Sequence, residues 1–378
     1  MSAKRRTRGR RNASLPKFLV ARLDPLRARL REQEVDALLV SNAVDIRYLT
    51  GFVGDDSWAL VPARGRAVTI LSDRRFEEQV ATEAPWCRAV MRKRSLIDEL
   101  EKLGRQKKLR TLAVQGAYLN VDTFNRIRKQ LTGVTLRAID DGLLMQRSVK
   151  DARETRAIRA ALEIHQQAMR NTLGRVRPGM TEKQIAAMLE YEMRSLGADG
   201  VSFPTIVAAG ANASLPHAVP GDAKVQRNGA FLIDCGVKLD GYCSDLTRVY
   251  ALGKMPKMIR EIYKVTLDAQ RAAIDAIAPG RLLRDVDKVA RDIITAAGYG
   301  EQFGHSLGHG IGLNIHEQPV LATRAEGELA PGQIVTVEPG IYLPGVGGVR
   351  IEDDVLVTAR GRSVLSDLPT DLESAMIA

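Results

Sequence analysis

The chain has 378 residues, of which 45% are hydrophobic and 27% charged, a composition typical of a soluble globular protein with two domains. No apolar run approaches the roughly 20 residues that a membrane-spanning helix needs, and the N-terminus lacks the hydrophobic region of a signal peptide, so we expect a cytoplasmic protein. The cysteines, Cys87, Cys235 and Cys243, show no Cys-x-x-Cys spacing, which fits a reducing compartment.

Part of the formal net charge of +11 comes from a short N-terminal stretch, residues 1–15. Without its six basic residues the rest of the chain carries about +5, which is ordinary for this length. The basic residues are Lys4, Arg5, Arg6, Arg8, Arg10 and Arg11. We predict a disordered, solvated basic tail; nonspecific contact with nucleic acid is the weaker alternative.

Residues 16–145 alternate between helical and strand patterns, which predicts a small α/β domain. We expect helices at 20–33, 75–82, 95–103 and 121–131. We expect strands at 37–41, 58–62, 67–72, 111–115 and 134–139.

Residues 146–378 contain an internal repeat. A long helical run at 152–176 ends at Pro178-Gly179, and a second helix follows, with Thr181 and Gln184 predicting a capping box. Pro279-Gly280 leads a similar helix 101 residues later. The repeat predicts two helix-helix-strand halves around a shared antiparallel sheet, an α+β fold with pseudo-twofold symmetry. The place where the halves meet is a natural cleft.

Three of the five histidines in the chain, His305, His309 and His316, lie within twelve residues. His217 lies in another loop flanked by glycine and proline, and only His165 lies in a helical run. Histidine is the commonest metal ligand and proton carrier near neutral pH, so the clustering predicts a site. Loop histidines with satisfied hydrogen bonds remain the alternative at this point.

The spacing of His305 and His309 would suit a helical zinc motif, in which two histidines share one helical face. Four glycines argue against a helix here, because each costs about 1 kcal/mol in a helix interior. They are Gly304, Gly308, Gly310 and Gly312. We therefore reject the helical zinc motif.

Two carboxylates flank a predicted hairpin in the first half. Asp234 ends an apolar strand beginning at Ala230, and Asp245 lies on the returning strand. A four-residue loop at 238–241 would set the two acids directly opposite each other, and any even-length loop keeps them on one face. Facing carboxylates repel each other unless a cation or a proton lies between them. Two unrelated solvent-facing acids are the alternative.

The second half offers a similar pair, Glu338 and Glu352. An odd-length loop would place both on one face, although Pro339 interrupts the ladder. Arg350 shares a strand face with Glu352, and we expect its guanidinium to orient that carboxylate and hold it ionised. The next two acids are interpreted as a solvated rim: Asp353 and Asp354.

The candidate ligands are Asp234, Asp245, His309, Glu338 and Glu352, a set of four carboxylates and one imidazole. One divalent ion would leave two negative charges uncompensated in a buried site, whereas two divalent ions balance all four. Oxygen-rich ligation favours harder metals, so Mn²⁺ is our first choice, with Co²⁺, Fe²⁺ and Zn²⁺ as alternatives.

Taken together, these segments resemble the pita-bread metallopeptidases, the superfamily of methionine aminopeptidase, aminopeptidase P and prolidase. The matching motifs are Leu232–Gly236, Tyr242–Arg248, His305–Gly312, Thr336–Tyr342 and Arg350–Asp354. Within the superfamily the chain is most similar to bacterial Xaa-Pro aminopeptidases and dipeptidases. Residues 16–145, with Arg47–Phe52 and Ser72–Gln79, resemble the creatinase-type N-terminal domain.

The resemblance implies a role for each candidate residue. Asp234 would chelate one metal, His309 and Glu338 the other, and Asp245 and Glu352 would bridge both. Glu338 would also be the general base. The remaining roles fall on the substrate side: His217 and His316 would contact the scissile amide and its tetrahedral intermediate, and His305, Tyr342, Arg350 and Phe203 would shape the pocket.

The implied activity is metal-dependent hydrolysis of the Xaa-Pro bond at the N-terminus of peptides by a water molecule that two metals activate. A strict Xaa-Pro dipeptidase is the nearest alternative. A non-catalytic peptide-binding module of the same fold is less favoured, because the ligand set is intact. The resemblance also implies a homodimer or a higher homo-oligomer.

Overall fold

The computed structural model describes residues 15–140 and 142–377, and the chain separates into two compact units, Met1–Gln146 and Arg147–Ala378. The basic tail predicted for residues 1–15 lies, except for Leu15, outside the described residues. None of the helices in the described part of the chain is long and apolar enough to cross a membrane.

The N-terminal unit is built on a six-stranded mixed sheet in the order β4-β3-β2-β1-β5-β6. The central strand β1 pairs antiparallel with β2 and parallel with β5. The strands are β1 (Ala37–Val40), β2 (Trp58–Pro62), β3 (Thr69–Ser72), β4 (Arg88–Met91), β5 (Thr111–Gln115) and β6 (Thr135–Ile139).

Helices alternate with these strands along the chain. They are α1 (Lys17–Glu32), α2 (Ala43–Thr50), the 3-10 turn η1 (Arg74–Phe76), α3 (Glu77–Glu83), α4 (Leu96–Lys107) and α5 (Val121–Gln130). The short helix α6 (Leu143–Ser148) contains the boundary between the two units, with Arg147 and Ser148 in the C-terminal unit. Leu100 of α4 and Ile127 of α5 pack in one core with Leu39 and Leu112 of the sheet. The sequence prediction missed α2 and β4.

The first half of the C-terminal unit has two helices followed by strands. Its elements are α7 (Ala152–Leu173), α8 (Glu182–Ser195), β7 (Gly200–Val201), β8 (Ile206–Ala209), η2 (Gly210–Ser214), β9 (Ala230–Cys235), β10 (Val237–Leu239), β11 (Tyr242–Cys243) and β12 (Leu246–Leu252). The predicted capping box is present at the start of α8, between Thr181 and Gln184.

The second half repeats this order. Its elements are α9 (Lys257–Ala276), α10 (Leu283–Ala296), η3 (Gly300–Gln302), β13 (Gly308–Gly310), β14 (Glu317–Leu321), β15 (Ile334–Val337), β16 (Gly340–Leu343), β17 (Gly347–Arg350), β18 (Asp353–Thr358), β19 (Gly361–Val364) and β20 (Met376–Ile377). Gly197 and Gly298 follow α8 and α10 with φ of 105° and 88°, a left-handed conformation that ends a helix and favours glycine.

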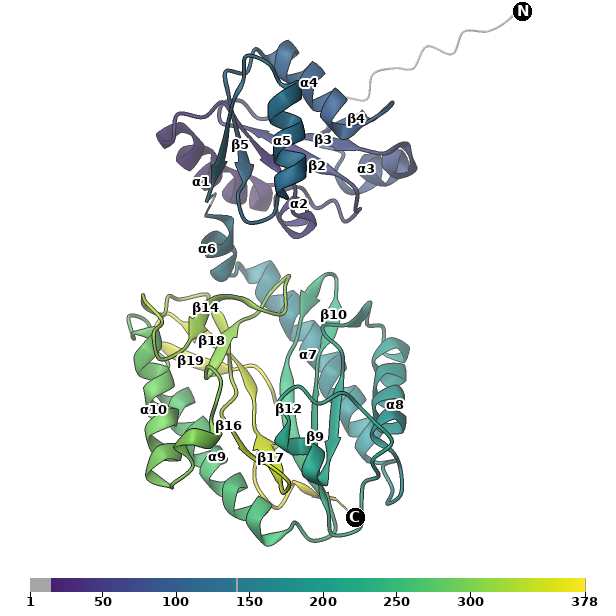
Figure 1. The fold of residues 1–378 in the computed structure, drawn as a ribbon, viewed down its shortest axis with the longest axis vertical. Coiled ribbons are helices and arrows are strands. Elements are labelled where there is room, and N and C mark those ends of the chain that lie inside the picture. The colour runs from purple at the N-terminus through teal and green to yellow at the C-terminus, as the bar shows by residue number, and fades with distance from the viewer. Residues whose placement is uncertain (1–14, 141, 378) are drawn as a thin grey trace, which may run out of the picture. The chain divides into compact units, whose positions relative to one another are not determined.

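Helices cover both faces of the strand layer in the C-terminal unit, with α7 and α8 on one side and α9 and α10 on the other (Figure 1). Along β9, Phe231 and Ile233 pack in the core that includes α7 and α8. Leu232 packs in the core that includes α9 and α10. Because both faces are buried, β9 is apolar at every position up to Asp234. The predicted α+β duplication is confirmed.

The β9–β12 register places Thr247, and not Asp245, directly opposite Asp234. The predicted four-residue loop is wrong, because Leu239 pairs with Tyr242 and leaves only Asp240 and Gly241 in the turn. Both turn residues have positive φ, 46° and 74°, as a two-residue hairpin turn requires. The loop length is still even, so Asp245 lies two residues before Thr247 on the face of Asp234.

In the second half, two ladders share one register. Val337 pairs with Asp353 in the β15–β18 ladder, and Gly340 pairs with Arg350 in the β16–β17 ladder. Glu338 and Glu352 therefore occupy facing positions in the gap between the ladders. The Glu352 backbone N–H donates to the Thr247 carbonyl at 3.2 Å, which joins the strands of the two halves at this gap.

Candidate metal centre

Four of the five candidate ligands lie in direct proximity. Ligand atoms of Asp245, His309 and Glu352 are all within 4.8 Å of one another. His309 Nε2 is 3.4 Å from Glu338 Oε1 and 3.7 Å from Asp245 Oδ2. Asp234, the fifth, lies close enough to raise the pKa values of Asp245 and Glu352. The residues come from both halves, at the junction that the Glu352–Thr247 backbone bond forms.

The acids of the cluster raise one another's pKa values, because each negative charge makes ionisation of its neighbours less favourable. Burial, followed by the charges of neighbouring acids, raises the pKa values of Asp245 and Glu352 well above their usual range. Burial raises the pKa of Glu338 to about 8, and Asp234 adds to the shift against the opposing effect of Arg350. Without a cation or bound protons, this concentration of negative charge would destabilise the fold.

Two buried oxygens in the cluster need a partner. Asp234 Oδ1 and Asp245 Oδ1 have no hydrogen-bond partner among the described residues. An unsatisfied buried acceptor costs about 1–3 kcal/mol, and more when it is charged. A divalent cation would satisfy both oxygens and offset the repulsion, and carboxylate oxygens with one imidazole suit such ions. The residues present therefore fit a metal centre.

His309 is prepared to act as a ligand through Nε2. Its Nδ1 lies 3.1 Å from the Gly310 carbonyl, which can only accept, so Nδ1 carries the hydrogen. Burial lowers the pKa of His309 to about 4, so the ring is neutral at pH 7. The Nε2 lone pair consequently faces Asp245 and Glu338.

Two threonines that the sequence interpretation missed support the ligands. Thr247 Oγ1 donates to Glu352 Oε2 at 2.6 Å. Thr336 Oγ1 lies 3.3 Å from Glu338 Oε1 and accepts the His309 backbone N–H at 3.0 Å. The signal was present for Thr247, since it lies two residues after Asp245 on the same strand face.

Arg350 makes its direct ion pair with Asp234 and not with Glu352, although its charge lowers the pKa of Glu352 against the larger effects of burial and the neighbouring acids. Its Nη2 pairs with Asp234 Oδ2, and its Nε donates to Thr247 Oγ1 at 3.1 Å. The Thr247 hydroxyl thus accepts a hydrogen bond from the guanidinium and donates one to Glu352. The guanidinium therefore reaches Glu352 through Thr247, and its direct charge partner is Asp234.

The predicted solvated rim is also wrong, because Asp353 and Asp354 are both buried. Asp353 accepts from Arg248 Nη2 at 2.7 Å and from Gln270 Nε2 at 2.6 Å. Asp354 Oδ2 accepts the Asp245 backbone N–H at 3.3 Å. Burial raises the pKa of Asp354 well above its usual range. Asp354 thus contacts the backbone of a candidate ligand, whereas Asp353 binds Arg248, Gln270 and the nearby Ser366 hydroxyl.

A directional hydrogen-bond chain joins three of the predicted pocket residues. Arg350 Nη1 donates to the Tyr342 hydroxyl at 2.6 Å, and that hydroxyl lies 3.0 Å from His305 Nε2. His305 Nδ1 lies 2.8 Å from the Ser306 carbonyl and so carries the hydrogen. Burial lowers the pKa of His305 to about 4. The neutral ring therefore accepts from Tyr342, and Phe303 packs edge-on against it.

The other substrate-side candidates border the cluster. The exposed His316 ring packs edge-on against His309, with centroids 4.5 Å apart. Partial burial, and then His217, lowers the pKa of His316. His217 is exposed, and Arg350 Nη2 donates to the carbonyl of its neighbour Pro216 at 3.3 Å. A Cβ at Gly236 would lie 3.0 Å from the half-buried Phe203 ring.

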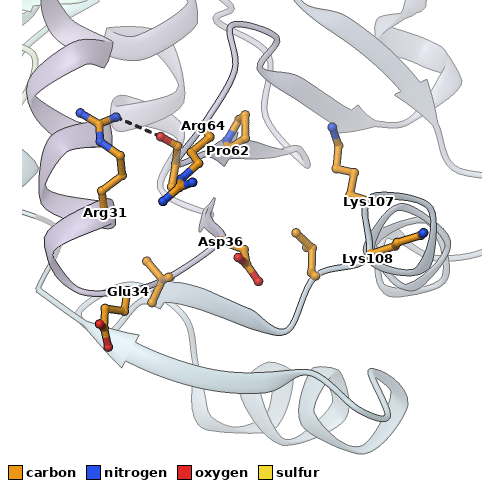
Figure 2. A pocket seen from close by; sticks show the side chains of 10 residues that line it. Arg31, Glu34, Asp36, Pro62, Arg64, Lys107 and Lys108 are labelled. Atoms are coloured by element: carbon orange, nitrogen blue, oxygen red, sulfur yellow. Dashed lines mark hydrogen bonds between the residues drawn. The ribbon is translucent and has the colours of Figure 1, made fainter.

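A separate cavity of about 740 Å³ lies in the N-terminal unit (Figure 2). None of the candidate site residues lines it, and several lining residues are basic. Arg31 lies in the last turn of α1 and donates to the Ala63 carbonyl at 3.1 Å, and Lys107 lies in the last turn of α4. Cations are favoured at helix C-termini, so these charges need no ligand to explain them.

Comparisons with known proteins agree with this geometry. An Xaa-Pro dipeptidase of Pyrococcus furiosus is 33% identical over 351 residues, covering 93% of this chain and 99% of the relative. A solved structure of an Xaa-Pro dipeptidase from Bacillus anthracis has a TM-score of 0.90 and 35% identity, over 94% of this chain and 99% of that one. For the X-Pro aminopeptidase structure from Thermotoga maritima the TM-score is 0.85 and the identity 37%, over 91% and 99%.

Family matches cover both units. Residues 22–149 match the Creatinase/Prolidase N-terminal domain, and residues 156–359 match Metallopeptidase family M24. The resemblance predicted from the motifs is confirmed, as is the predicted fold of a creatinase-type domain followed by a pita-bread domain. The family implies divalent metal ions, in agreement with the acidic cluster. The chain belongs to Metallopeptidase family M24.

Proposed function

We propose that this protein is an exopeptidase that hydrolyses the bond before proline at the N-terminus of peptides, with two divalent metal ions. The observation that carries the proposal is the buried cluster of Asp245, His309 and Glu352, whose ligand atoms lie within 4.8 Å of one another. Relatives named Xaa-Pro dipeptidase and X-Pro aminopeptidase, each aligned over more than nine tenths of this chain, support the substrate class.

The ligands would divide between the two ions. Asp234 would hold one ion, His309 and Glu338 the other, and Asp245 and Glu352 would bridge both. The partnerless oxygens of Asp234 and Asp245 support this division, because each needs a partner that the described residues do not supply. Four carboxylates and two divalent ions balance in charge. We propose Mn²⁺ first, since four of the five ligating residues offer oxygen.

When bound, the ions would acidify a water molecule and polarise the carbonyl of the residue before proline. Glu338 would take the proton of the attacking water as general base. Proline nitrogen bears no hydrogen before cleavage, so it leaves as a secondary amine only if a proton is delivered to it. Glu338 would deliver to the proline nitrogen the proton that it took from the water, so that the proton balance of the cleavage closes.

The remaining site residues would bind and orient the peptide. His316 and His217 are exposed at the border of the cluster, where their ring N–H groups could donate to the substrate carbonyl as negative charge develops on it. The Arg350–Tyr342–His305 chain would fix one wall of the pocket, and Phe203 would offer an apolar face. We also propose a homodimer or a higher homo-oligomer, which sedimentation analysis would test.

Peptide length separates an aminopeptidase from a strict dipeptidase. The metal-loaded protein should be assayed on Gly-Pro and on a longer peptide that begins with Gly-Pro, with Gly-Ala as the matched control. An aminopeptidase cleaves the longer peptide and leaves Gly-Ala intact. Cleavage of Gly-Pro alone would favour the dipeptidase. The relatives named Xaa-Pro dipeptidase keep this alternative open.

A non-catalytic peptide-binding module makes different predictions. Such a protein would contain no stoichiometric metal, and Glu338→Ala would change no rate. Under the proposed function, the wild-type protein binds divalent ions and Glu338→Ala abolishes measurable hydrolysis while the chain stays folded. Metal analysis of both proteins, together with their rates on an Xaa-Pro peptide, decides between the two.

A further inference from the structure

Glu317 lies directly behind one of the substrate-side histidines. It is the first residue of β14 and follows His316 immediately. Neighbouring residues of an extended segment point to opposite sides. His316 is accordingly exposed, whereas the Glu317 side chain is only 1% exposed. A buried carboxylate is thus one residue away from an imidazole at the border of the metal centre.

Two buried cations hold this carboxylate. Arg147 Nη2 pairs with Oε1, and Lys150 Nζ lies 3.2 Å from Oε2, and both cationic side chains are 1% exposed. Burial alone would raise the pKa of Glu317, but Lys150 and Arg147 outweigh it and hold the pKa below its usual value. Charge-assisted bonds on both oxygens restrict the carboxylate to one orientation.

The carboxylate in turn holds the loop that carries His316. Its Oε1 accepts the Asn314 backbone N–H at 3.0 Å. A Cβ at Gly312 would lie 2.6 Å from Oε2, so the carboxylate fills the space under the loop. The loop connects β13, which carries His309, to β14, and the His309 and His316 rings pack with centroids 4.5 Å apart. The Glu317 position therefore sets the path of the backbone between the two rings.

We propose that Glu317, clamped by Arg147 and Lys150, is a positioning residue that fixes the His316 imidazole against His309 on the substrate side of the metal centre. This inference rests on the proposed peptidase function, because His316 has a catalytic role only there. Glu317 touches neither substrate nor metal; it acts through His316 alone.

A second buried carboxylate provides a matched control. Glu182 is buried and accepts the backbone N–H groups of Ala209 at 2.7 Å and Gly221 at 2.8 Å. These two bonds hold the ends of the segment that carries His217. Glu182 thus holds the His217 segment as Glu317 holds the His316 loop. Each carboxylate should therefore couple to its own histidine and not to the other.

The test is a set of double-variant cycles in the Mn²⁺-loaded protein with an Xaa-Pro tripeptide. Glu317→Gln should lower kcat by about tenfold with KM nearly unchanged, because misplacing a catalytic group weakens transition-state contacts. In a His316→Ala background, Glu317→Gln should cause no further loss. In a His217→Ala background, Glu317→Gln should still lower kcat by about tenfold. Glu182→Gln should instead lower kcat in the His316→Ala background and cause no further loss in the His217→Ala background.

Folding is controlled with a charge-balanced variant. Glu317→Gln leaves Arg147 and Lys150 without their shared anion. If this single variant unfolds, the double variant Glu317→Gln/Lys150→Met, which has the same net charge as the wild-type protein, takes its place in the cycles. Circular dichroism and metal content are compared for every variant. Equal losses in the His316→Ala and His217→Ala backgrounds, or no loss in kcat, would overturn the positioning role.

The wild-type assay separates this inference from the function on which it rests. If the wild-type protein hydrolyses no Xaa-Pro peptide, the proposed function fails and the inference fails with it. If the wild-type protein is active and the Glu317 cycles are additive, only the inference fails.

Discussion

Glu338 and Glu352 face each other across the gap between two antiparallel ladders that share one register. At such a gap the backbone no longer pairs strand to strand, and the Glu352 N–H is instead bonded to the Thr247 carbonyl of the other half. The facing carboxylates and the junction of the halves coincide. The duplicated fold thereby brings acids from both halves into one site.

Replacing Glu352 by glutamine should remove metal and activity together. The substitution keeps the size of the side chain but removes one negative charge from the buried cluster, so both ions should bind more weakly and hydrolysis should fall about a hundredfold or more. Metal content by mass spectrometry and the rate on an Xaa-Pro peptide provide the check. Glu301→Gln, at an exposed position, is the control and should leave both unchanged. Full metal content in Glu352→Gln would contradict the ligand assignment.

The sequence predicted the acids better than it predicted their surroundings. Asp234 could be placed because it follows four consecutive apolar residues in β9, a pattern typical of a strand buried on both faces. The hairpin register was missed because Lys238 and Leu239 continue the ladder. The Asp240-Gly241 pair was the available signal for a two-residue turn.

Long-range partners explain the remaining errors. Asp353 and Asp354 are consecutive acids and therefore suggested a solvated rim, but both are buried, and Arg248, Gln270 and the Asp245 backbone contact them from distant segments. Which strands meet cannot be deduced from hydrophobic pattern alone. In the N-terminal unit, α2 is only eight residues long and β4 is a largely exposed edge strand, so both gave weak periodic signals.

Thr247→Val should weaken metal binding without removing a ligand. Thr247 Oγ1 donates to Glu352 and accepts from Arg350, so valine would leave both groups without this partner. Loss of a group that orients a ligand typically costs about tenfold to a hundredfold in metal affinity. Titration calorimetry with Mn²⁺ measures the change.

A buried threonine elsewhere provides the control for that experiment. Thr266 in α9 is fully buried, and its hydroxyl has no hydrogen-bond partner among the described residues. Thr266→Val should leave Mn²⁺ affinity unchanged. Equal affinity in the wild-type protein and Thr247→Val would mean that Glu352 needs no support from this hydroxyl.

The stability of the metal-stripped protein should fall as pH rises between about 4.5 and about 8. Burial raises the pKa of Glu338 in the folded chain from 4.5 to about 8, so the folded state retains a proton that the unfolded state releases. Its contribution is fully present below pH 4.5 and is lost as pH rises through 8. Asp245 and Glu352 shift in the same direction.

Bound divalent ions should remove this penalty, so the difference in Tm between metal-loaded and metal-stripped protein should widen with pH across the same window. Scanning calorimetry of both forms at each pH cancels the titration of distant groups. If the difference in Tm stays constant from about pH 5 to about pH 8, the bound ions do not relieve a pH-dependent repulsion in the acidic cluster, and the prediction is wrong.

Tyr342→Phe should impair catalysis while leaving the metals bound. The hydroxyl accepts from Arg350 at 2.6 Å and faces His305 Nε2 at 3.0 Å, and phenylalanine removes both contacts while keeping the ring. We expect kcat/KM to fall about tenfold at unchanged metal content, because the pocket wall loses its fixed orientation. Tyr191→Phe, on an exposed tyrosine of α8, serves as the control. Wild-type kinetics in Tyr342→Phe would show that the hydrogen bonds of the Tyr342 hydroxyl to Arg350 and His305 do not help to position the substrate.

The central claim, metal-dependent cleavage before proline, is tested most directly by stripping the protein of metal and restoring ions one at a time. Activity on an Xaa-Pro peptide should be absent in the stripped protein and return with two equivalents of Mn²⁺, while Xaa-Ala peptides stay intact. Stripped protein that cleaves at the wild-type rate, or metal-loaded protein that cleaves no Xaa-Pro peptide, would contradict the account.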